Sequence, residues 1–269
     1  MINNTITKIA IGSFDGIHLA HQRLISYAEA IVVIEQNKAM LTRGYRRSFY
    51  INKPIFIYHF EHICFLRPQE FVGMLKRDFP KLNTIIVGYD FEFGYKKSGN
   101  VKVLEEIFKG EVFVVKEVLL NNISIHSRTI KSYLQEGNVV MANRLLGRAY
   151  EMMGCVIKGQ GIGSKELVST INMVTENYLM PKEGVYASRI FVNDCWYDSI
   201  SFIGHRASTD NSFAIETNII GKSIELKSKH ITLQWLEFIR PNEKFNDLKT
   251  LKAQILKDIE QAKKIHNER

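Results

Sequence analysis

The pattern of apolar segments changes at about residue 150, and this change most limits the folds open to the chain. Before it, short apolar segments alternate with helix-like ones, as in Ile6–Gly12, about 21–30 and 31–34. Such alternation is typical of a parallel sheet covered by helices on both faces. After it, short strand-like segments follow one another between turn residues, which is typical of a small antiparallel barrel. We therefore expect a doubly wound α/β domain over 1–150 and a β-barrel domain with a terminal helix over 151–269.

The same patterns predict the remaining elements and the place of a site. Two N-terminal strands end in glycine, at Gly12 and Gly88, and ligands of parallel sheets bind at the carboxyl ends of the strands. We therefore expect a site at that edge. The other predicted strands are 54–58, 83–88, 111–115, 155–157, 184–192, 195–200, 212–219 and 230–239, and the helices are 69–79, 101–108, 128–136, 139–146 and 248–266.

The composition excludes several classes of protein. The sequence has no run of 18 apolar residues, and residues 1–5 do not resemble the start of a secretory signal, so we expect no membrane contact. Three scattered cysteines without a Cys-x-x-Cys argue against a disulfide framework or a zinc site. We expect reduced thiols in a cytoplasmic protein.

The charge is uneven along the chain. The net charge is +8, and 20 of the 36 basic but only 13 of the 28 acidic residues lie in 1–150. A basic half suits polyphosphate or nucleic-acid ligands, and it equally suits an ordinary solvated surface. Charge alone leaves these open.

The segment 12–21, Gly-Ser-Phe-Asp-Gly-Ile-His-Leu-Ala-His, follows the first predicted strand. Gly12 allows a ligand to approach the backbone closely, and His18 and His21 share one face at the start of a helix. A helix N-terminus attracts phosphate, and two imidazoles there can stabilise charge during phosphoryl or nucleotidyl transfer. Two histidines at this spacing, taken alone, are more often packing or surface residues.

The whole segment resembles the Gly-x-Phe-Asp-Gly-x-His-x-Gly-His signature of bacterial bifunctional riboflavin kinase/FMN adenylyltransferases, and departs from it only at Ala20. The resemblance implies that His18 and His21 are catalytic. It also implies a nucleotide-binding role for five neighbours: Gly12, Phe14, Asp15, Gly16 and Ala20.

Two further segments of the first half resemble the same family. The run 87–99 is similar to the family's Gly-x-Asp-Phe-x-Phe-Gly loop, which implies flavin contacts by Asp90, Phe91 and Phe93, although a buried aromatic turn is an alternative. The segment 126–131 corresponds more loosely to an ATP-phosphate element. It implies nucleotide contacts by Ser127, Arg128 and Lys131.

The segment 41–47 lacks the family's usual Phe-x-Pro-His-Pro and instead holds three arginines, Arg43, Arg46 and Arg47. These serve either phosphate or the surface, and the sequence does not decide between the two.

The second half resembles the family's kinase module. A glycine-rich loop offers close approach to phosphate, although such strings are usually flexible turns, and a Thr-x-Asn pair implies oxygen ligands for Mg²⁺. An Ile-Gly-x-Arg turn implies a flavin contact, and one glutamate corresponds to the family's catalytic base. In that order, the residues are Gly159, Gly161 and Gly163; Thr170 and Asn172; Arg206; and Glu216.

The resemblance implies ATP-dependent phosphorylation of riboflavin to FMN and adenylylation of FMN to FAD, with Mg²⁺ and with small molecules as the only partners. No nucleic-acid partner is expected, and the sequence does not give the oligomeric state. Two alternatives remain: an adenylyltransferase with a degenerate kinase module, and a non-enzymatic flavin or RNA binder.

Overall fold

The computed structural model describes residues 5–42, 44–157, 168–206 and 211–269. The chain packs as two compact units, Met1–Ser127 and Arg128–Arg269. The predicted glycines Gly159, Gly161 and Gly163 and the predicted Arg43 lie outside the described residues.

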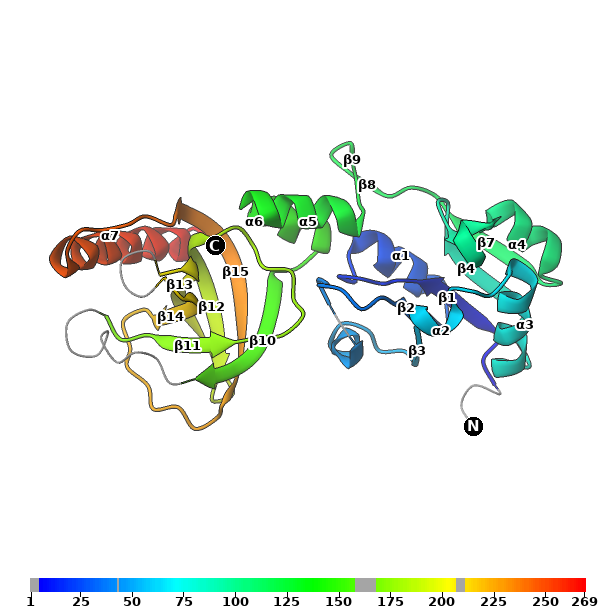
Figure 1. The fold of residues 1–269 in the computed structure, drawn as a ribbon, viewed down its shortest axis with the longest axis horizontal. Coiled ribbons are helices and arrows are strands. Elements are labelled where there is room, and N and C mark those ends of the chain that lie inside the picture. Colours follow the sequence, from blue (N-terminus) through cyan, green and yellow to red (C-terminus); the bar gives the residue numbers. More distant parts are fainter. Residues whose placement is uncertain (1–4, 43, 158–167, 207–210) are drawn as a thin grey trace. The chain divides into compact units, whose positions relative to one another are not determined.

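The first unit is built on a parallel sheet of five strands in the order β3-β2-β1-β4-β7 (Figure 1). Its strands are β1 (Lys8–Gly12), β2 (Ala30–Glu35), β3 (Ile55–His59), β4 (Thr84–Gly88) and β7 (Glu111–Val115). The connecting helices are α1 (Leu19–Tyr27), α2 (Phe60–Ile63), α3 (Pro68–Asp78) and α4 (Val101–Ile107), with the short 3₁₀ helices η2 (Gly44–Phe49) and η3 (Tyr95–Lys97).

Both faces of this sheet are buried, as a doubly wound sheet requires. Side chains alternate between the faces of a strand, so Ile9 and Ile11 of β1 enter one apolar cluster while Ala10 enters the other. Gly12 and Gly88 end two hydrogen-bonded parallel strands, so the loops that follow leave the same edge of the sheet. The expected α/β architecture and the expected edge for a site are therefore present.

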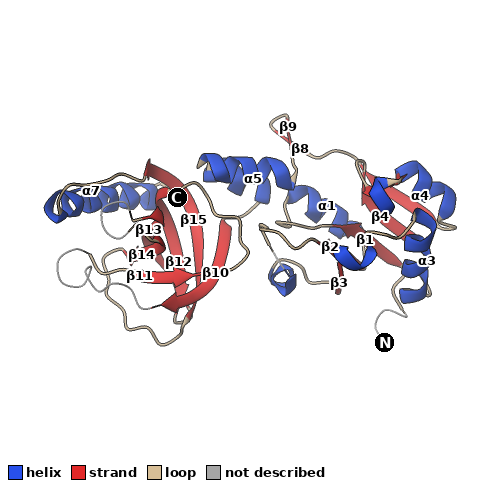
Figure 2. Ribbon diagram, viewed as in Figure 1, coloured by secondary structure: helices blue, strands red, loops and turns tan. Residues whose placement is uncertain are grey.

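The second unit is a closed antiparallel barrel in the strand order β10-β11-β14-β13-β12-β15 (Figure 2). Its strands are β10 (Tyr150–Ile157), β11 (Ile171–Val174), β12 (Gly184–Val192), β13 (Cys195–His205), β14 (Phe213–Ile219) and β15 (His230–Pro241). The terminal helix α7 (Leu248–Asn267) packs Ala262 and Ile265 against Val185, Ala187 and Leu236 on the outside of the barrel. The expected barrel and terminal helix are confirmed.

Helices α5 (Ser127–Glu136) and α6 (Val139–Leu146) precede the domain boundary that we expect near residue 150. By their contacts, however, they group with the barrel rather than with the first unit, apart from Ser127 itself. The Asn143 side chain explains the anchoring of α6, because its amide donates to the Trp235 carbonyl and its oxygen accepts from the Tyr150 N–H. The boundary between the two units therefore lies after Ser127, ahead of the change in sequence pattern at about residue 150.

Two short strand pairs lie in loops of the first unit. They are β5 (Glu92–Phe93) with β6 (Gly99–Asn100) and β8 (Leu119–Leu120) with β9 (Ile123–Ser124).

The three cysteines form no disulfide, and Cys155 and Cys195 are exposed, so these two are not core residues. Among the described residues, no helix has the length and apolar character needed to cross a membrane.

Candidate functional sites

The loop between β1 and α1 has an unusual backbone. Phe14, Gly16 and Ile17 have φ angles of 46°, 92° and 44°, and a positive φ is uncommon for phenylalanine and strained for a β-branched residue. Phe14 and Ile17 are both fully buried in the apolar cluster that includes Ala10 of β1. Strained loops persist only where the surroundings fix them, and they concentrate at functional sites.

Asp15 fixes this loop from within. Its carboxylate is 3% exposed and accepts from the backbone N–H groups of Leu41 and Thr42, at 2.7 and 3.1 Å. Its carbonyl accepts from the Ser127 hydroxyl at 2.7 Å. The structure therefore brings Ser127 to the predicted nucleotide loop, but the Asp15 side chain faces the protein.

His18 and His21 lie together at the start of α1. His18 is the N-cap residue, and its Nδ1 accepts from the His21 N–H at 3.3 Å. The two imidazoles are stacked, with centroids 3.5 Å apart and planes 16° from parallel. Because Nδ1 is the acceptor, the neutral ring carries its proton on Nε2, which is then a hydrogen-bond donor. Ala20 follows as the second residue of α1 and is half-buried.

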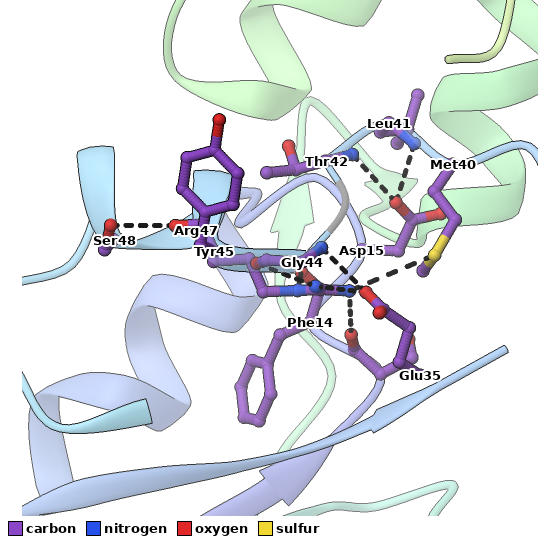
Figure 3. A network of polar contacts seen from close by, with 11 residues as sticks. Phe14, Asp15, Glu35, Met40, Leu41, Thr42, Gly44, Tyr45, Arg47 and Ser48 are labelled. Carbon is purple, nitrogen blue, oxygen red and sulfur yellow. Dashed lines mark hydrogen bonds and ion pairs between the residues drawn. The ribbon is translucent and has the colours of Figure 1, made fainter. Parts of the chain in front are cut away.

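Arg47 is a candidate residue whose burial and contacts could not be predicted from the sequence (Figure 3). Its side chain is 0% exposed and pairs with Glu35 at the end of β2, with Nη1 2.7 Å from Oε1. Its guanidinium also donates to the carbonyls of Ser13 and Phe14, each at 3.2 Å. Arg47 therefore contacts neither solvent nor an open phosphate site, and both alternatives drawn from the sequence are wrong for it.

The loop after β4 presents polar and apolar groups separately. Asp90 is exposed and lies 3.8 Å from the His126 imidazole. Phe93 is 5% exposed and packs on Phe71 in the core, and Phe91 stacks on Phe93 at 5.4 Å. The alternative of a buried aromatic turn describes Phe93, and flavin contacts by Asp90, Phe91 and Phe93 stay a prediction.

A second polar cluster lies on the barrel. The Arg206 Nε donates to Glu216 Oε1 at 2.6 Å, while Nη2 donates to Asn172 Oδ1 at 2.8 Å and Nη1 to the Ser212 hydroxyl at 2.7 Å. Glu216 of β14 and Asn172 of β11 are register partners on adjacent strands, so the pairing of these strands brings both to Arg206. One arginine thus joins the predicted base to a predicted metal ligand.

The remaining predicted residues are placed less tightly. Thr170 is half-buried just before β11, and Arg128 and Lys131 belong to α5 in the second unit, whereas His18 and His21 belong to the first. Within the described parts of the chain, no three His, Cys, Asp or Glu side chains cluster as metal ligands would.

Family models match both parts of the chain. A riboflavin kinase model matches residues 146–266, and an FAD synthetase model matches residues 46–132. The first match covers the barrel with Asn172, Arg206 and Glu216. The second covers the loop after β4 and Ser127, and it begins after the His18–His21 segment.

Similar proteins span nearly the whole chain. A bifunctional riboflavin kinase/FMN adenylyltransferase of Buchnera aphidicola subsp. Acyrthosiphon pisum is 29% identical over 98% of this chain and 95% of its own length. Proteins of that name from Listeria monocytogenes and Bacillus subtilis are 28% and 27% identical, each over 94% of this chain and 90% of their own.

A crystal structure described as a macrolide-efflux protein from Streptococcus pneumoniae has the same fold. The TM-score is 0.85 at 24% identity, and the match covers 97% of this chain and 96% of that one. At this identity the likeness establishes the two-unit architecture alone. The matches to two family models in one chain and the full-length relatives go further: the chain belongs to the bifunctional riboflavin kinase/FMN adenylyltransferase family.

Proposed function

We propose that this chain phosphorylates riboflavin to FMN with ATP and then transfers AMP from a second ATP to FMN, giving FAD and pyrophosphate. The observation that carries the proposal is the presence of both family modules in one chain, each with its own polar cluster. The substrates ATP, riboflavin and FMN follow from family membership.

In the adenylyl transfer, a phosphate oxygen of FMN attacks the α-phosphorus of ATP, and the bond to the pyrophosphate oxygen breaks. The nucleophile is already anionic, so the protein needs to position two polyanions and neutralise their charge rather than remove a proton. We assign this to the start of α1. The His18 Nε2–H donates to a phosphate oxygen, and His21 lies stacked beside it for a second contact.

Main-chain groups supply the rest of that site. Gly12, Phe14, Asp15 and Gly16 act through the backbone of the loop, since the Phe14 and Asp15 side chains are buried. Ser127 supports the loop through the Asp15 carbonyl. We retain Ala20, Arg128 and Lys131 as nucleotide contacts, and Asp90, Phe91 and Phe93 as flavin contacts.

In the kinase reaction, the 5′-hydroxyl of riboflavin attacks the γ-phosphorus of ATP, and ADP leaves. The Glu216 carboxylate takes the hydroxyl proton as the new bond forms. Arg206 holds Glu216 in place with a hydrogen bond of 2.6 Å, and its charge lies beside the phosphates that arrive. Its role is therefore wider than the flavin contact expected from the sequence.

Mg²⁺ fits the donor set at this site. Thr170 and Asn172 offer uncharged oxygen ligands, which suit a hard cation that keeps phosphate oxygens and water in its shell. Asn172 Oδ1 accepts one hydrogen bond from Arg206, and its second lone pair is the one a cation would use. The ion would neutralise phosphate charge. Gly159, Gly161 and Gly163, which lie outside the described residues, stay predicted nucleotide contacts.

Chromatography of the products from purified protein, riboflavin, ATP and Mg²⁺ tests both activities. Formation of both FMN and FAD supports the proposal. FAD formed only from supplied FMN would leave adenylyltransferase activity alone, and no turnover of either flavin overturns the proposal that the protein is an enzyme. His21→Ala should abolish FAD formation from supplied FMN and leave FMN formation from riboflavin intact, while Glu216→Ala should do the reverse. Equal loss of both activities, each measured from its own flavin substrate, contradicts two separate sites.

A further inference from the structure

We infer that Arg47 is a positioning residue for adenylyl transfer, acting through the main chain of the loop that precedes His18. This inference rests on the proposed function of that loop. Arg47 comes from η2, outside the His18–His21 segment, and meets the predicted nucleotide loop at main-chain carbonyl groups.

The buried ion pair between Arg47 and Glu35 is not explained by a gain in the stability of the folded protein. Its side chain is 0% exposed and that of Glu35 is 6% exposed. Removing two charges from water costs as much as their attraction returns, so a buried ion pair is weak evidence for stabilisation. Such a pair is retained more readily where its geometry specifies a structure.

The geometry here is that of a clamp. All three guanidinium nitrogens are engaged: Nε donates to the Phe14 carbonyl, Nη1 to Glu35 and to the Gly44 carbonyl, and Nη2 to the Ser13 carbonyl, with the Met40 sulfur 4.0 Å from Nη2 (Figure 3). Glu35 Oε1 in turn accepts from the Gly44 N–H at 2.8 Å. One side chain therefore ties the end of β2 and the start of η2 to two successive carbonyls of the loop.

Those two carbonyls decide how the loop presents its N–H groups. In a trans peptide the C=O and N–H point in opposite directions, so holding the Ser13 and Phe14 carbonyls toward Arg47 turns the N–H groups of Phe14 and Asp15 away from it. Successive N–H groups turned to one side form an anion-binding concavity. Phe14 has a φ of 46° in this arrangement, a strained value for a residue other than glycine, and the clamp opposes its relaxation.

Lysine cannot replace this function. The guanidinium is a planar fork with donors at fixed directions, whereas an ammonium is a point charge on a flexible stem. A lysine at this position would keep the charge opposite Glu35 but could not hold the Ser13 and Phe14 carbonyls together. Arg47→Lys therefore separates the pairing of charges from the shape of the loop.

The test uses the full chain and measures FAD from supplied FMN, with FMN from riboflavin as an internal control. We expect Arg47→Lys to lower kcat for FAD formation about 100-fold, as misplacement by about an ångström does, and to leave FMN formation unchanged. Glu35→Gln breaks the same charge pair but leaves the carbonyl contacts, so it should keep most of the FAD activity. Arg67→Lys, in an exposed pair with Glu70 at 2.8 Å, is the matched control and should change neither activity.

The contrast between the two sides of the pair carries the test, because a purely structural pair would lose activity equally from either side. Equal loss in Arg47→Lys and Glu35→Gln, or full activity in Arg47→Lys, overturns the inference. If Arg47→Lys unfolds the first unit, the double variant Glu35→Gln/Arg47→Met removes both charges. It should fold and still fail to make FAD; normal FAD formation, or failure to fold, overturns the inference. A wild-type chain that makes no FAD refutes the proposed function instead.

Discussion

The His18 side chain is hydrogen-bonded to the His21 backbone: His18 Nδ1 accepts from the His21 N–H. The two rings are stacked, with their centroids 3.5 Å apart. His18 therefore caps α1 through Nδ1, and a contact between its ring and phosphate is the second role that we propose for it. The two roles can be separated by choice of substituent, because asparagine is a good N-cap and has no imidazole.

His18→Asn should keep α1 capped and lower kcat for FAD formation about 100-fold, the contribution of a well-placed hydrogen-bond donor to the charge of the transition state. Chromatographic rates of FAD formation at saturating FMN and ATP check this, and FMN formation should stay at the wild-type rate. His18→Ala removes the cap as well, so it should unfold at a lower urea concentration than His18→Asn. If the two variants unfold together, the capping role is wrong.

Arg206→Lys should lower kcat for FMN formation by about tenfold or more, because lysine cannot hold Glu216 and Asn172 in one plane. FAD formation from supplied FMN should not change. The comparison is Arg189→Lys, whose guanidinium lies 3.4 Å from an exposed Asp198 on the same barrel and which we expect to be neutral. Kinase activity within twofold of the wild-type enzyme in Arg206→Lys would remove Arg206 from the site.

Glu29 should make the stability of the first unit depend on pH. Its carboxylate accepts from the N–H groups of Thr7 and Lys8 and from the Thr7 hydroxyl, and the Thr7 N–H chiefly holds the Glu29 pKa below its usual 4.5. A lowered pKa means stability that is present above the unfolded pKa and is lost as the pH falls through the folded one.

Glu29→Gln should therefore unfold at a lower urea concentration than the wild-type protein at pH 7. The difference should shrink as the pH falls below the usual glutamate pKa. Urea unfolding of both proteins at several pH values measures it, and a difference that stays constant with pH would mean that the carboxylate charge contributes nothing.

Gly154→Ala should destabilise the barrel by about 1–3 kcal/mol, the usual cost of overpacking. A Cβ at Gly154 would meet the Val174 carbonyl and lie 2.7 Å from the Met173 Cγ, where β10 pairs with β11. The matched control is Gly73→Ala in α3, where a Cβ meets nothing within 4 Å and alanine should stabilise the helix by up to about 1 kcal/mol. Equal shifts in the urea midpoints of the two variants would contradict this.

The regular elements could be predicted where local chemistry marks both ends. Helix α6 runs from Val139 to Leu146 as expected, because the Asn138 side chain caps its start and Gly147 ends it with φ of 73°. Strand β11 was not predicted, since its four residues carry little periodicity and its pairing with β10 and β14 joins distant parts of the chain. Likewise, β10 begins at Tyr150 rather than at 155 because it pairs with β15.

The sequence names candidate site residues but does not show which way their side chains point. The sequence indicated Asp15 and Phe14 and could not show that both side chains face inward. It indicated Arg206 as a flavin contact and could not show the contacts with Glu216 and Asn172, which arise from strand register. It indicated Arg47 and could not show that this side chain is buried against Glu35, because arginine is rarely buried and nothing local pairs position 47 with position 35.

The attachment of α6 to the barrel through Asn143 decides where this chain can be divided. A fragment that starts at residue 151 would lack Asn143 and Tyr150, leaving the Trp235 carbonyl without the amide donor. A fragment that starts at residue 128 retains both helices with the strands they cover. Anyone isolating the barrel should therefore cut more than twenty residues ahead of its first strand.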